Sequence, residues 1–186
     1  PVPPYPFTPG YEISGVVKEL GEGVEETGLI IGDRVVSICG MGGYSEQIVC
    51  PAERCFKLPF GISFDVAAAF PVTYLTAHHM LTYLGNFQQG DSILVHHAAG
   101  GVGTATAQLA KALGASKVFG TASATKAEFV KSLGMRFIDR GAEDFVEVCK
   151  NETDGDGVHH ALDPVGGKHM MRSYKALRSG GRLYAF

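Results

Sequence analysis

The sequence predicts an α/β fold in which a doubly wound parallel sheet follows part of a small antiparallel β-barrel. Up to residue 71, short stretches of alternating apolar and polar residues are separated by glycines and prolines. From residue 72 onward, near-continuous apolar segments alternate with amphipathic segments. The first pattern is typical of short antiparallel strands, and the second is typical of parallel strands covered by helices. We therefore expect two domains, at residues 1–71 and 72–186.

In the first domain, five prolines within the first nine residues precede three alternating stretches, at residues 11–18, 33–39 and 44–50. Each stretch predicts one strand of the barrel. A proline-rich connector is an unusual way to open a domain. We therefore expect the chain to be a fragment of a longer protein that begins within the barrel.

The second domain contains five expected strands, at residues 92–96, 117–121, 136–138, 158–163 and 182–186. Amphipathic segments between them predict helices at residues 74–84, 102–113, 126–133, 144–150 and 168–177. A complete dinucleotide-binding sheet of this type has six strands, so we expect the last strand to be missing. Such a sheet binds its ligand beyond the carboxyl ends of the strands.

A glycine-rich elbow within residues 90–111 joins the first parallel strand to its helix. Ala98, Gly100 and Gly103 have the spacing of the G-x-G-x-x-G fingerprint, with alanine in the first position. The middle glycine lets the backbone approach a pyrophosphate, and the third lets the helix pack closely on its strand. The N–H groups of residues 101–104 are expected to face the negative charge. The preceding strand and following helix support the motif. The expected pyrophosphate-binding residues are Ala99, Gly100, Gly101, Val102 and Gly103.

The end of the second parallel strand indicates which dinucleotide binds. An NAD site places an acidic residue about 20 residues after the glycines, where it binds the ribose 2′-hydroxyl. Residues 118–126 carry hydroxyls and a lysine, and the first carboxylate is that of Glu128. We therefore expect NADP(H), with Ser123 and Lys126 at the 2′-phosphate, because hydroxyls donate to phosphate and lysine neutralises it. Thr121, at the end of the same strand, is also expected to bind the cofactor. In a second interpretation, residues 123–125 only cap the next helix, and both can hold.

The composition argues against several classes of partner. The chain has 186 residues, 16 of them basic and 19 acidic, with a net charge of −3 and no block of like charge. We expect neither nucleic acid nor an anionic membrane surface as a partner. No segment has the roughly 18 consecutive apolar residues of a membrane span, and no signal peptide opens the chain. We expect no membrane span and a cytoplasmic location.

No metal site is expected from the sequence. The chain has four cysteines, at positions 39, 50, 55 and 149, and none belongs to a C-x-x-C pair. They are expected to be reduced thiols. Six of the seven histidines occur as three adjacent pairs. Side chains of adjacent residues point in different directions, so none of the three histidine pairs is arranged to chelate one ion with both rings.

Five segments together resemble the medium-chain dehydrogenase/reductase superfamily, and within it the zinc-independent quinone oxidoreductases related to zeta-crystallin. They are residues 9–17, 32–35, 67–77, 90–111 and 163–167. The resemblance implies a Rossmann-type domain without its last strand, preceded by part of a GroES-like catalytic domain. It also implies hydride transfer from NADPH to a quinone or another conjugated carbonyl, such as an enone, and a homodimer when full length. The catalytic residues of the family lie upstream of Pro1, so they are unknown here.

Two departures separate this chain from the zinc alcohol dehydrogenases of the superfamily. Tyr11 occupies the position of a histidine zinc ligand, and the four-cysteine structural lobe is missing. The resemblance therefore implies a reaction that is independent of zinc. Two other functions share the same motifs. One is an enoyl-thioester reductase, alone or within a polyketide synthase, and the other is a non-enzymatic NADPH-binding crystallin or vesicle-associated protein.

The resemblance also implies roles for four further residues. Thr73 corresponds to a contact on the nicotinamide side or to a helix N-cap. Val165 and Phe186 correspond to contacts with the nicotinamide ribose and ring, or to core packing. Arg140 stands where related reductases often carry a tyrosine near the adenosine. Its guanidinium is expected to bind phosphate and stack on adenine, or else to pair at the surface with a carboxylate of residues 139–144.

Overall fold

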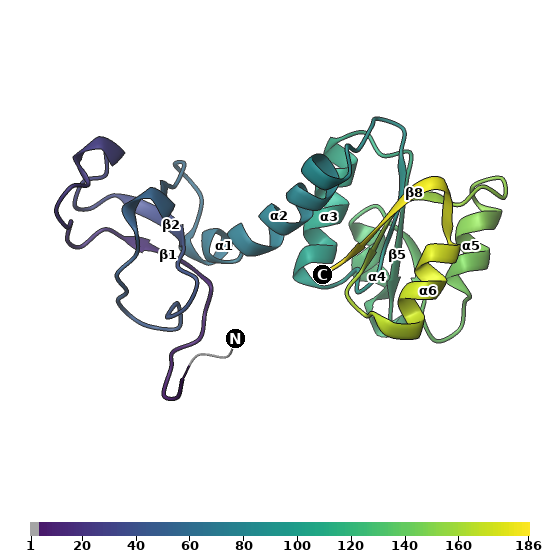
Figure 1. Ribbon diagram of the computed structural model, residues 1–186, viewed down its shortest axis with the longest axis horizontal. Helices are drawn as coiled ribbons and strands as arrows, with labels where there is room; N and C mark the ends of the chain where they lie inside the picture. The colour runs from purple at the N-terminus through teal and green to yellow at the C-terminus, as the bar shows by residue number, and fades with distance from the viewer. Residues whose placement is uncertain (1–3) are drawn as a thin grey trace. The chain divides into compact units, whose positions relative to one another are not determined.

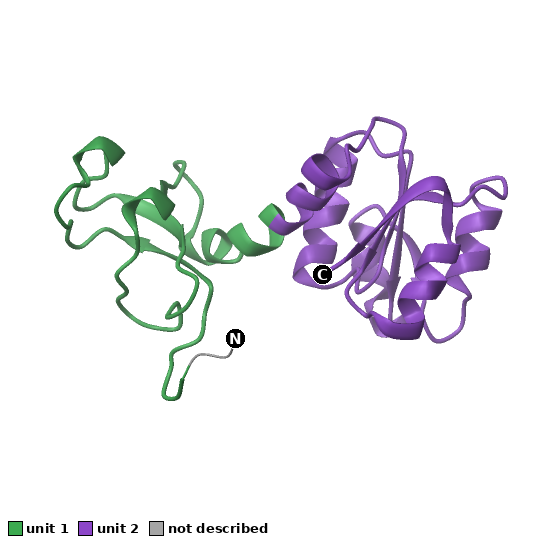
Figure 2. Ribbon diagram, viewed as in Figure 1, with its two compact units in different colours: residues 1–75 green, residues 76–186 purple. Residues whose placement is uncertain are grey.

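The computed structural model describes residues 4–186, so the first three residues of the expected barrel domain lie outside it (Figure 1). The chain forms two compact units, residues 1–75 and residues 76–186 (Figure 2). Each unit has a sheet of its own. The division falls within helix α2, which spans Pro71–His78.

Unit 1 is built on a three-stranded antiparallel sheet with the order β1-β2-β3. Its strands are β1 (Glu12–Val16), β2 (Arg34–Ile38) and β3 (Cys55–Lys57). The strands expected within residues 11–18 and 33–39 are confirmed as β1 and β2. Both come from short alternating stretches bounded by glycine, which is the pattern that predicts half-buried strands.

The strand expected at residues 44–50 is wrong. Within the described part of the chain this segment pairs with no strand, and the N–H of Tyr44 donates to the carbonyl of Pro9 at 2.9 Å. The side chains of Tyr44 and Val49 are 78% and 97% exposed. An alternating pattern forms a strand only where a partner strand and an apolar layer receive it. The third strand lies further along the chain, at β3.

Short helices complete unit 1. The hydroxyl of Ser63 caps α1 by accepting the N–H of Val66 at 3.4 Å. Pro71 begins α2, where its missing N–H leaves no hydrogen bond unmade. The carboxylate of Glu12, in β1, accepts the N–H of Val72 at 2.7 Å and so holds the first turn of α2. Helix α1 spans Phe64–Ala68, and the two short 3₁₀-helices of this unit are η1 (Glu25–Thr27) and η2 (Ala52–Arg54).

Unit 2 holds five parallel strands in the order β6-β5-β4-β7-β8. The chain enters the sheet at β4, adds strands on one side and then adds strands on the other, which is the doubly wound order of Rossmann-type folds. All five expected strands are confirmed. The last one begins earlier than expected, inside a segment that we assigned to a helix. The bounds are Ser92–Val95 (β4), Lys117–Ala122 (β5), Arg136–Asp139 (β6), Val158–Asp163 (β7) and Leu177–Ala185 (β8).

Helices cover both faces of this sheet (Figure 1). The helix expected at residues 74–84 is α2 followed by one π-helical segment, and the other four expected helices are confirmed. The helical segments of unit 2 are η3 (His79–Leu84), α3 (Gly101–Ala112), η4 (Ala124–Lys126), α4 (Ala127–Ser132), α5 (Phe145–Asn151) and α6 (Gly167–Lys175). No helix within residues 4–186 is both long enough and apolar enough to cross a bilayer.

The side chains of the central strand β4 explain why helices cover both faces of the sheet. Leu94 packs with Phe145 and Cys149 of α5 on one face, whereas Ile93 and Val95 pack with the α3 side on the other. Successive side chains of a strand point to opposite faces. All of β4 is buried, so its apolar run has no polar alternation.

A buried polar group joins β7 and β8 to the turn before β4. The hydroxyl of Tyr184 lies 2.8 Å from Nδ1 of His160, and Nε2 of His160 lies 2.9 Å from Oδ2 of Asp91. Phe87 stacks on the imidazole with ring centroids 5.0 Å apart. Burial lowers the pKa of His160, and it outweighs the opposing effect of the Asp91 carboxylate.

This burial predicts an acid-dependent loss of stability. The unfolded chain protonates His160 below its ordinary pKa of 6.5, whereas the folded chain keeps it neutral to lower pH. Unfolding therefore takes up a proton, and stability falls as the pH drops below 6.5, by at most about 1.4 kcal/mol per pH unit for one group. Urea unfolding of wild type and His160→Gln at several pH values measures this. The variant should show a shallower decline between pH 6.5 and pH 5, and an unchanged slope would contradict the assignment.

Candidate functional site

The elbow between β4 and α3 leaves three backbone amides free. The N–H of Gly100 donates to the carbonyl of His97 at 2.8 Å, and the N–H of Ala98 donates to Thr121 at 3.0 Å. The N–H of Thr104 donates to the carbonyl of Gly100 at 2.8 Å, so the expectation that this amide is free is wrong. The amides of residues 101–103 have no acceptor within residues 4–186, because they open the helix and no side chain caps it.

Gly103 allows α3 to lie directly against the elbow. A Cβ atom at this position would lie 2.6 Å from the carbonyl oxygen of His97 and 2.7 Å from that of Ala98. A Cβ atom on Gly100 would lie 3.2 Å from the same His97 oxygen. His97 itself has a φ of +52°, a left-handed conformation that reverses the chain between strand and helix. The third glycine therefore has the packing role that the spacing predicts.

The electrostatics at this end of α3 favour an anion. The helix has 12 residues, and its first turn contains no acidic side chain. The aligned peptide dipoles place positive partial charge at this terminus. Gly100 and Gly101 are exposed, so a ligand can reach the amides. The elbow can therefore hold a phosphate group through backbone N–H donors.

The ends of β5 and β6 add free polar and cationic groups beside the elbow. Ala122 pairs in register with Asp139, and the N–H of Arg140 donates to the carbonyl of Ala122 at 3.0 Å. Ser123 follows directly, and its hydroxyl lies 3.0 Å from that of Thr125 without capping a helix. Helix capping by the Ser123 side chain is therefore not seen. Lys126 is exposed, and it has no hydrogen-bond or ion-pair partner in the described part of the chain.

The side chain of Arg140 likewise forms no ion pair in the described part of the chain. Of the carboxylates that could pair with it, Glu143 binds Arg136 at 3.1 Å and Asp144 binds Arg172 at 2.9 Å. The third neighbouring carboxylate, at position 139, accepts a backbone N–H from residue 141. Among residues 4–186 no ion pair involves Arg140, whose side chain is exposed. The alternative of a surface ion pair is therefore wrong, and the guanidinium is available at the edge where β5 and β6 end.

Thr121, also expected to bind the cofactor, differs from Ser123 and Lys126. Its side chain is buried, and its hydroxyl lies 2.8 Å from Nδ1 of His96. The expectation that this hydroxyl contacts the cofactor is corrected, because Thr121 points into the sheet whereas Ser123 lies beyond its end. The difference arises because β5 ends at Ala122, so Ser123 has already left the sheet. Thr121 supports the elbow from below through the Ala98 hydrogen bond.

A buried polar network, which sequence reasoning missed, lies under the carboxyl ends of β4 and β7. Nε2 of His96 lies 3.0 Å from the hydroxyl of Ser173, which donates to Oδ2 of Asp163 at 2.5 Å. Nδ1 of His169 lies 2.9 Å from the same carboxylate oxygen. Asp163, His169 and Ser173 follow one another at the end of β7 and in α6, but His96 lies far earlier in the sequence, so no local motif joins it to them. In the sequence, only Asp163, an aspartate that ends an apolar strand, could have indicated this network.

Asp163 also shapes the loop after β7. Its Oδ1 accepts the N–H groups of Val165 at 2.7 Å and Gly166 at 3.0 Å. Burial opposes ionisation of Asp163, but the hydrogen bonds from Ser173, His169 and the two amides outweigh it and lower the pKa to about 2. The carboxylate is therefore charged at neutral pH and fixes the turn that leads into α6.

Three other expected site residues have exposed or separately bonded side chains. Val165 and Phe186 are 47% and 48% exposed, so core packing does not account for them. Both follow the ends of strands, β7 and β8 respectively. Thr73 is the third residue of α2, and its hydroxyl donates to the carbonyl of Ala69 at 2.9 Å, so it is not an N-cap. Thr73 belongs to unit 1.

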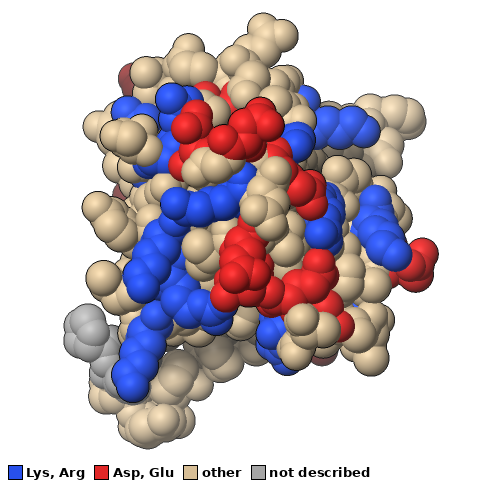
Figure 3. All heavy atoms as spheres, turned by 90° about the vertical axis from the view of Figure 1, so that its right-hand side faces the viewer, with Lys and Arg blue, Asp and Glu red and all other residues tan. Residues whose placement is uncertain are grey.

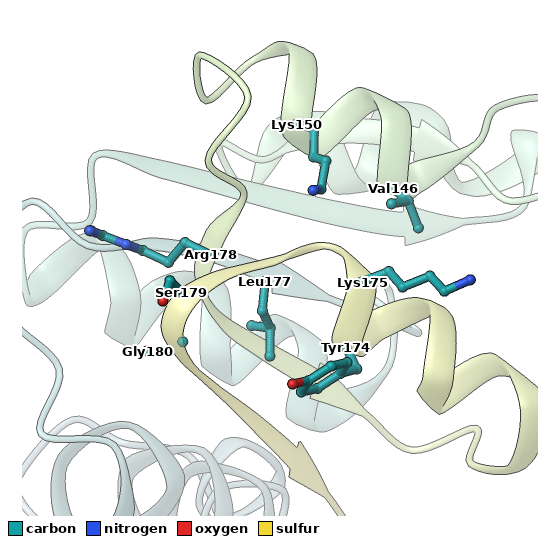
Figure 4. A pocket seen from close by; sticks show the side chains of 9 residues that line it. Val146, Lys150, Tyr174, Lys175, Leu177, Arg178, Ser179 and Gly180 are labelled. Atoms are coloured by element: carbon teal, nitrogen blue, oxygen red, sulfur yellow. The ribbon is translucent and has the colours of Figure 1, made fainter.

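A pocket of about 630 Å³ lies elsewhere in unit 2, where β8 begins (Figure 4). The elbow lies where β4 ends, so in a parallel sheet the two are at opposite edges. Figure 4 shows the side chains of Lys175 and Arg178 extending away from each other, which does not suit a phosphate. On the side of the molecule that carries α5 and α6, basic and acidic side chains lie next to one another (Figure 3). The Arg136 and Arg172 ion pairs belong to unit 2.

Comparison with known proteins agrees with this geometry. The family described as alcohol dehydrogenase GroES-like domain matches residues 1–60, and the family described as zinc-binding dehydrogenase matches residues 101–186. The quinone oxidoreductase of Escherichia coli, solved in complex with NADPH, superposes with a TM-score of 0.92 at 36% identity, over 100% of this chain and 57% of that one. The chain belongs to the medium-chain dehydrogenase/reductase superfamily.

Two further proteins that resemble the chain are not named as quinone oxidoreductases. The human synaptic vesicle membrane protein VAT-1 homolog is 40% identical over 186 residues, which are 100% of this chain and 47% of that protein. The CurK enoyl reductase superposes with a TM-score of 0.88 at 36% identity, over 95% of this chain and 53% of that one. The chain spans about half the length of the curated relatives it matches.

The zinc that one family description mentions does not fit unit 1. Tyr11 stands where the family resemblance implies a histidine ligand in zinc-dependent members, and its phenol is exposed. The thiol of Cys39 donates to the carbonyl of Gly10 at 3.5 Å, and that of Cys55 to the carbonyl of Pro51 at 3.6 Å. Within the described part of unit 1, no three His, Cys, Asp or Glu side chains converge on one point. The described residues of unit 1 therefore do not form the ligand set of a zinc ion.

The packing of α3 gives a direct prediction. Gly103→Ala should destabilise the chain by about 1–2 kcal/mol, because the clash with two carbonyl oxygens exceeds the gain in helix propensity of about 0.5–1 kcal/mol. Gly100→Ala is the matched control, since its Cβ has one neighbour at 3.2 Å and it should lose less than about 1 kcal/mol. Urea unfolding measures both. Equal stability of Gly103→Ala and wild type would contradict the close approach.

Proposed function

We propose that the chain is part of an NADPH-dependent oxidoreductase that transfers a hydride to a quinone or another conjugated carbonyl without using zinc. One observation carries the proposal: free amides of residues 101–103 lie beside the uncommitted cations of Lys126 and Arg140, at the carboxyl edge of one parallel sheet. A helix N-terminus suits a pyrophosphate, and a separate pair of cations suits a further phosphate. NADPH has both groups.

The strand order supports a direction for the bound dinucleotide. Ser123, Lys126 and Arg140 follow β5 and β6, and in this proposal they hold the 2′-phosphate and the adenosine. Residues 99–103 follow β4 and hold the pyrophosphate. Because β7 lies on the other side of β4, the nicotinamide half extends toward β7 and β8.

At that second end, Val165 and Phe186 are the proposed contacts with the nicotinamide ribose and ring. Their exposed side chains follow β7 and β8. The turn that carries Val165 is held by Asp163, which limits how far it moves. Thr73 is proposed as a further contact on the nicotinamide side. Bound NADPH supplies the hydride, and the residues of the chain bind it, orient it and exclude water.

Two further assignments belong to the whole protein. The acceptor is a small molecule, and residues outside this chain select it. A homodimer and a cytoplasmic location are proposed for the full-length form. The similarity to the CurK enoyl reductase makes an enoyl thioester the second candidate acceptor. The third candidate is a non-enzymatic NADPH-binding protein associated with vesicles, and the similarity to a protein named for the synaptic vesicle membrane supports the vesicle association.

An acceptor series tests the reaction. The full-length protein is mixed with NADPH and, separately, a quinone, an enone and an enoyl thioester, and loss of NADPH absorbance is followed with and without a chelator. We expect oxidation with the quinone or the enone and no effect of the chelator. Oxidation with the thioester alone would replace the first function by the second. Tight NADPH binding without oxidation by any acceptor would favour the third.

Cofactor preference is tested separately. Lys126→Ala and Arg140→Ala should each weaken NADPH binding by about 1–3 kcal/mol, since each removes a charge-assisted phosphate contact, and should leave NADH binding nearly unchanged. Fluorescence titration measures both affinities. The salt dependence of NADPH binding should become shallower in each variant, because a cation–phosphate contact is screened by ions.

Lys131→Ala is the matched control for this experiment. Lys131 is an exposed lysine of α4 that pairs with Glu128 at 2.9 Å, so its loss should change neither affinity. Equal losses of NADPH and NADH affinity in Lys126→Ala and Arg140→Ala would show that these cations do not recognise the 2′-phosphate.

A further inference from the structure

His96, Asp163 and His169 bring two imidazoles and a carboxylate together beneath the carboxyl ends of β4 and β7. One ligand atom from each residue lies within 4.8 Å of the other two. Nδ1 of His169 is 2.9 Å from Oδ2 of Asp163, and the two imidazole centroids are 4.3 Å apart with their planes at 78°. The expectation of no metal considered only neighbours in the sequence, whereas these three residues meet through the fold.

Atoms around the cluster orient the three side chains. Nδ1 of His96 is held by the hydroxyl of Thr121 at 2.8 Å, which leaves Nε2 directed at the cluster. Oδ1 of Asp163 accepts two backbone N–H groups, from Val165 and Gly166, which leaves Oδ2 directed at the cluster. In metal centres, ligating histidines and carboxylates are held in this way by hydrogen bonds at their second polar atom.

Burial and access also suit a cation. His96 and Asp163 are buried, whereas the side chain of His169 is 28% exposed and opens a route to solvent. Two imidazoles and one carboxylate are side chains that divalent transition metals accept as ligands.

The hydroxyl of Ser173 now occupies the centre of the cluster. It lies 2.5 Å from Oδ2 of Asp163 and 3.0 Å from Nε2 of His96. A bound ion displaces this hydrogen bond, and the hydroxyl oxygen or water can then serve as a fourth ligand. Before the ion binds, Nε2 of His96 donates to Ser173 and Nδ1 of His169 donates to Asp163. Each imidazole must therefore move its proton to its other ring nitrogen: His96 to Nδ1, where it donates to the hydroxyl of Thr121, and His169 to Nε2. With two neutral imidazoles, this exchange of tautomers releases no net proton.

We propose that His96 Nε2, Asp163 Oδ2 and His169 Nδ1 form a binding site for one divalent transition-metal ion. Two imidazoles with one carboxylate suit zinc, cobalt or iron better than magnesium or calcium. Tetrahedral zinc sets its ligand atoms about 3.4 Å apart, so the widest separation must shorten by roughly 1.4 Å, which rotation of the partly buried His169 side chain can supply. The ion ties the end of β7 to α6 and takes no part in the proposed hydride transfer.

Cobalt titration tests the site on the full chain after chelator treatment and dialysis. Wild type should develop the visible absorption of tetrahedral Co²⁺, saturating at about one ion per chain, and Zn²⁺ should displace it. His169→Ala should weaken Co²⁺ binding at least about 100-fold, because it removes a ligand. Thr121→Val keeps the shape of its side chain and should weaken binding about 10- to 100-fold through loss of the His96 contact.

The control is His79→Ala, which removes an exposed histidine outside the cluster and should leave binding unchanged. Circular dichroism and metal-free melting establish that each variant folds. His169 lies at the surface of α6, so its replacement is expected to be tolerated. Failure of wild type to show saturable Co²⁺ absorption overturns the site. So does a loss of affinity in His79→Ala as large as that in His169→Ala.

Discussion

The close contact between α3 and the elbow after β4 is the constraint on which the candidate site depends. Gly103 has no Cβ atom, so the first turn of α3 rests against the carbonyls of His97 and Ala98. This contact directs three unpaired amides out of the carboxyl edge of the sheet. Gly120 of β5 allows the same approach from below, since its Cβ would lie 2.8 Å from that of Ala98. Without both glycines the elbow could not pack this closely between α3 and β5.

The strand order places further phosphate-binding groups beside the elbow, along the same edge of the sheet. β5 and β6 lie on one side of β4 and are followed directly by Ser123 and Arg140, whereas β7 and β8 lie on the other side of β4. The neighbouring carboxylates are already paired with Arg136 and Arg172, which leaves Arg140 free. A ligand with phosphates at two separate points therefore finds donors at both. This combination of amides and cations separates the site from an ordinary helix terminus.

Much of unit 2 could be predicted from the sequence, because its signals are local. Apolar runs gave the five strands, and the spacing of Gly100 and Gly103 located the elbow. Long-range contacts were beyond such reasoning. Residues 44–50 alternate like a strand but find no partner strand in the described chain. Thr121 and Ser123 look equivalent in the sequence, yet one is buried against His96 and the other lies beyond the strand end. The cluster of His96, Asp163 and His169 has no spacing signature at all.

Amide chemical-shift mapping with NADPH tests the central claim most directly. The account predicts that the largest perturbations fall on the amides of residues 101–103, with a second group at Ser123, Lys126 and Arg140 that is weaker with NADH. The amides around the pocket at the start of β8 should not change. If the largest perturbations instead fall around Tyr174 and Arg178, with the elbow amides unmoved, the cofactor binds at the other edge of the sheet and the account is wrong.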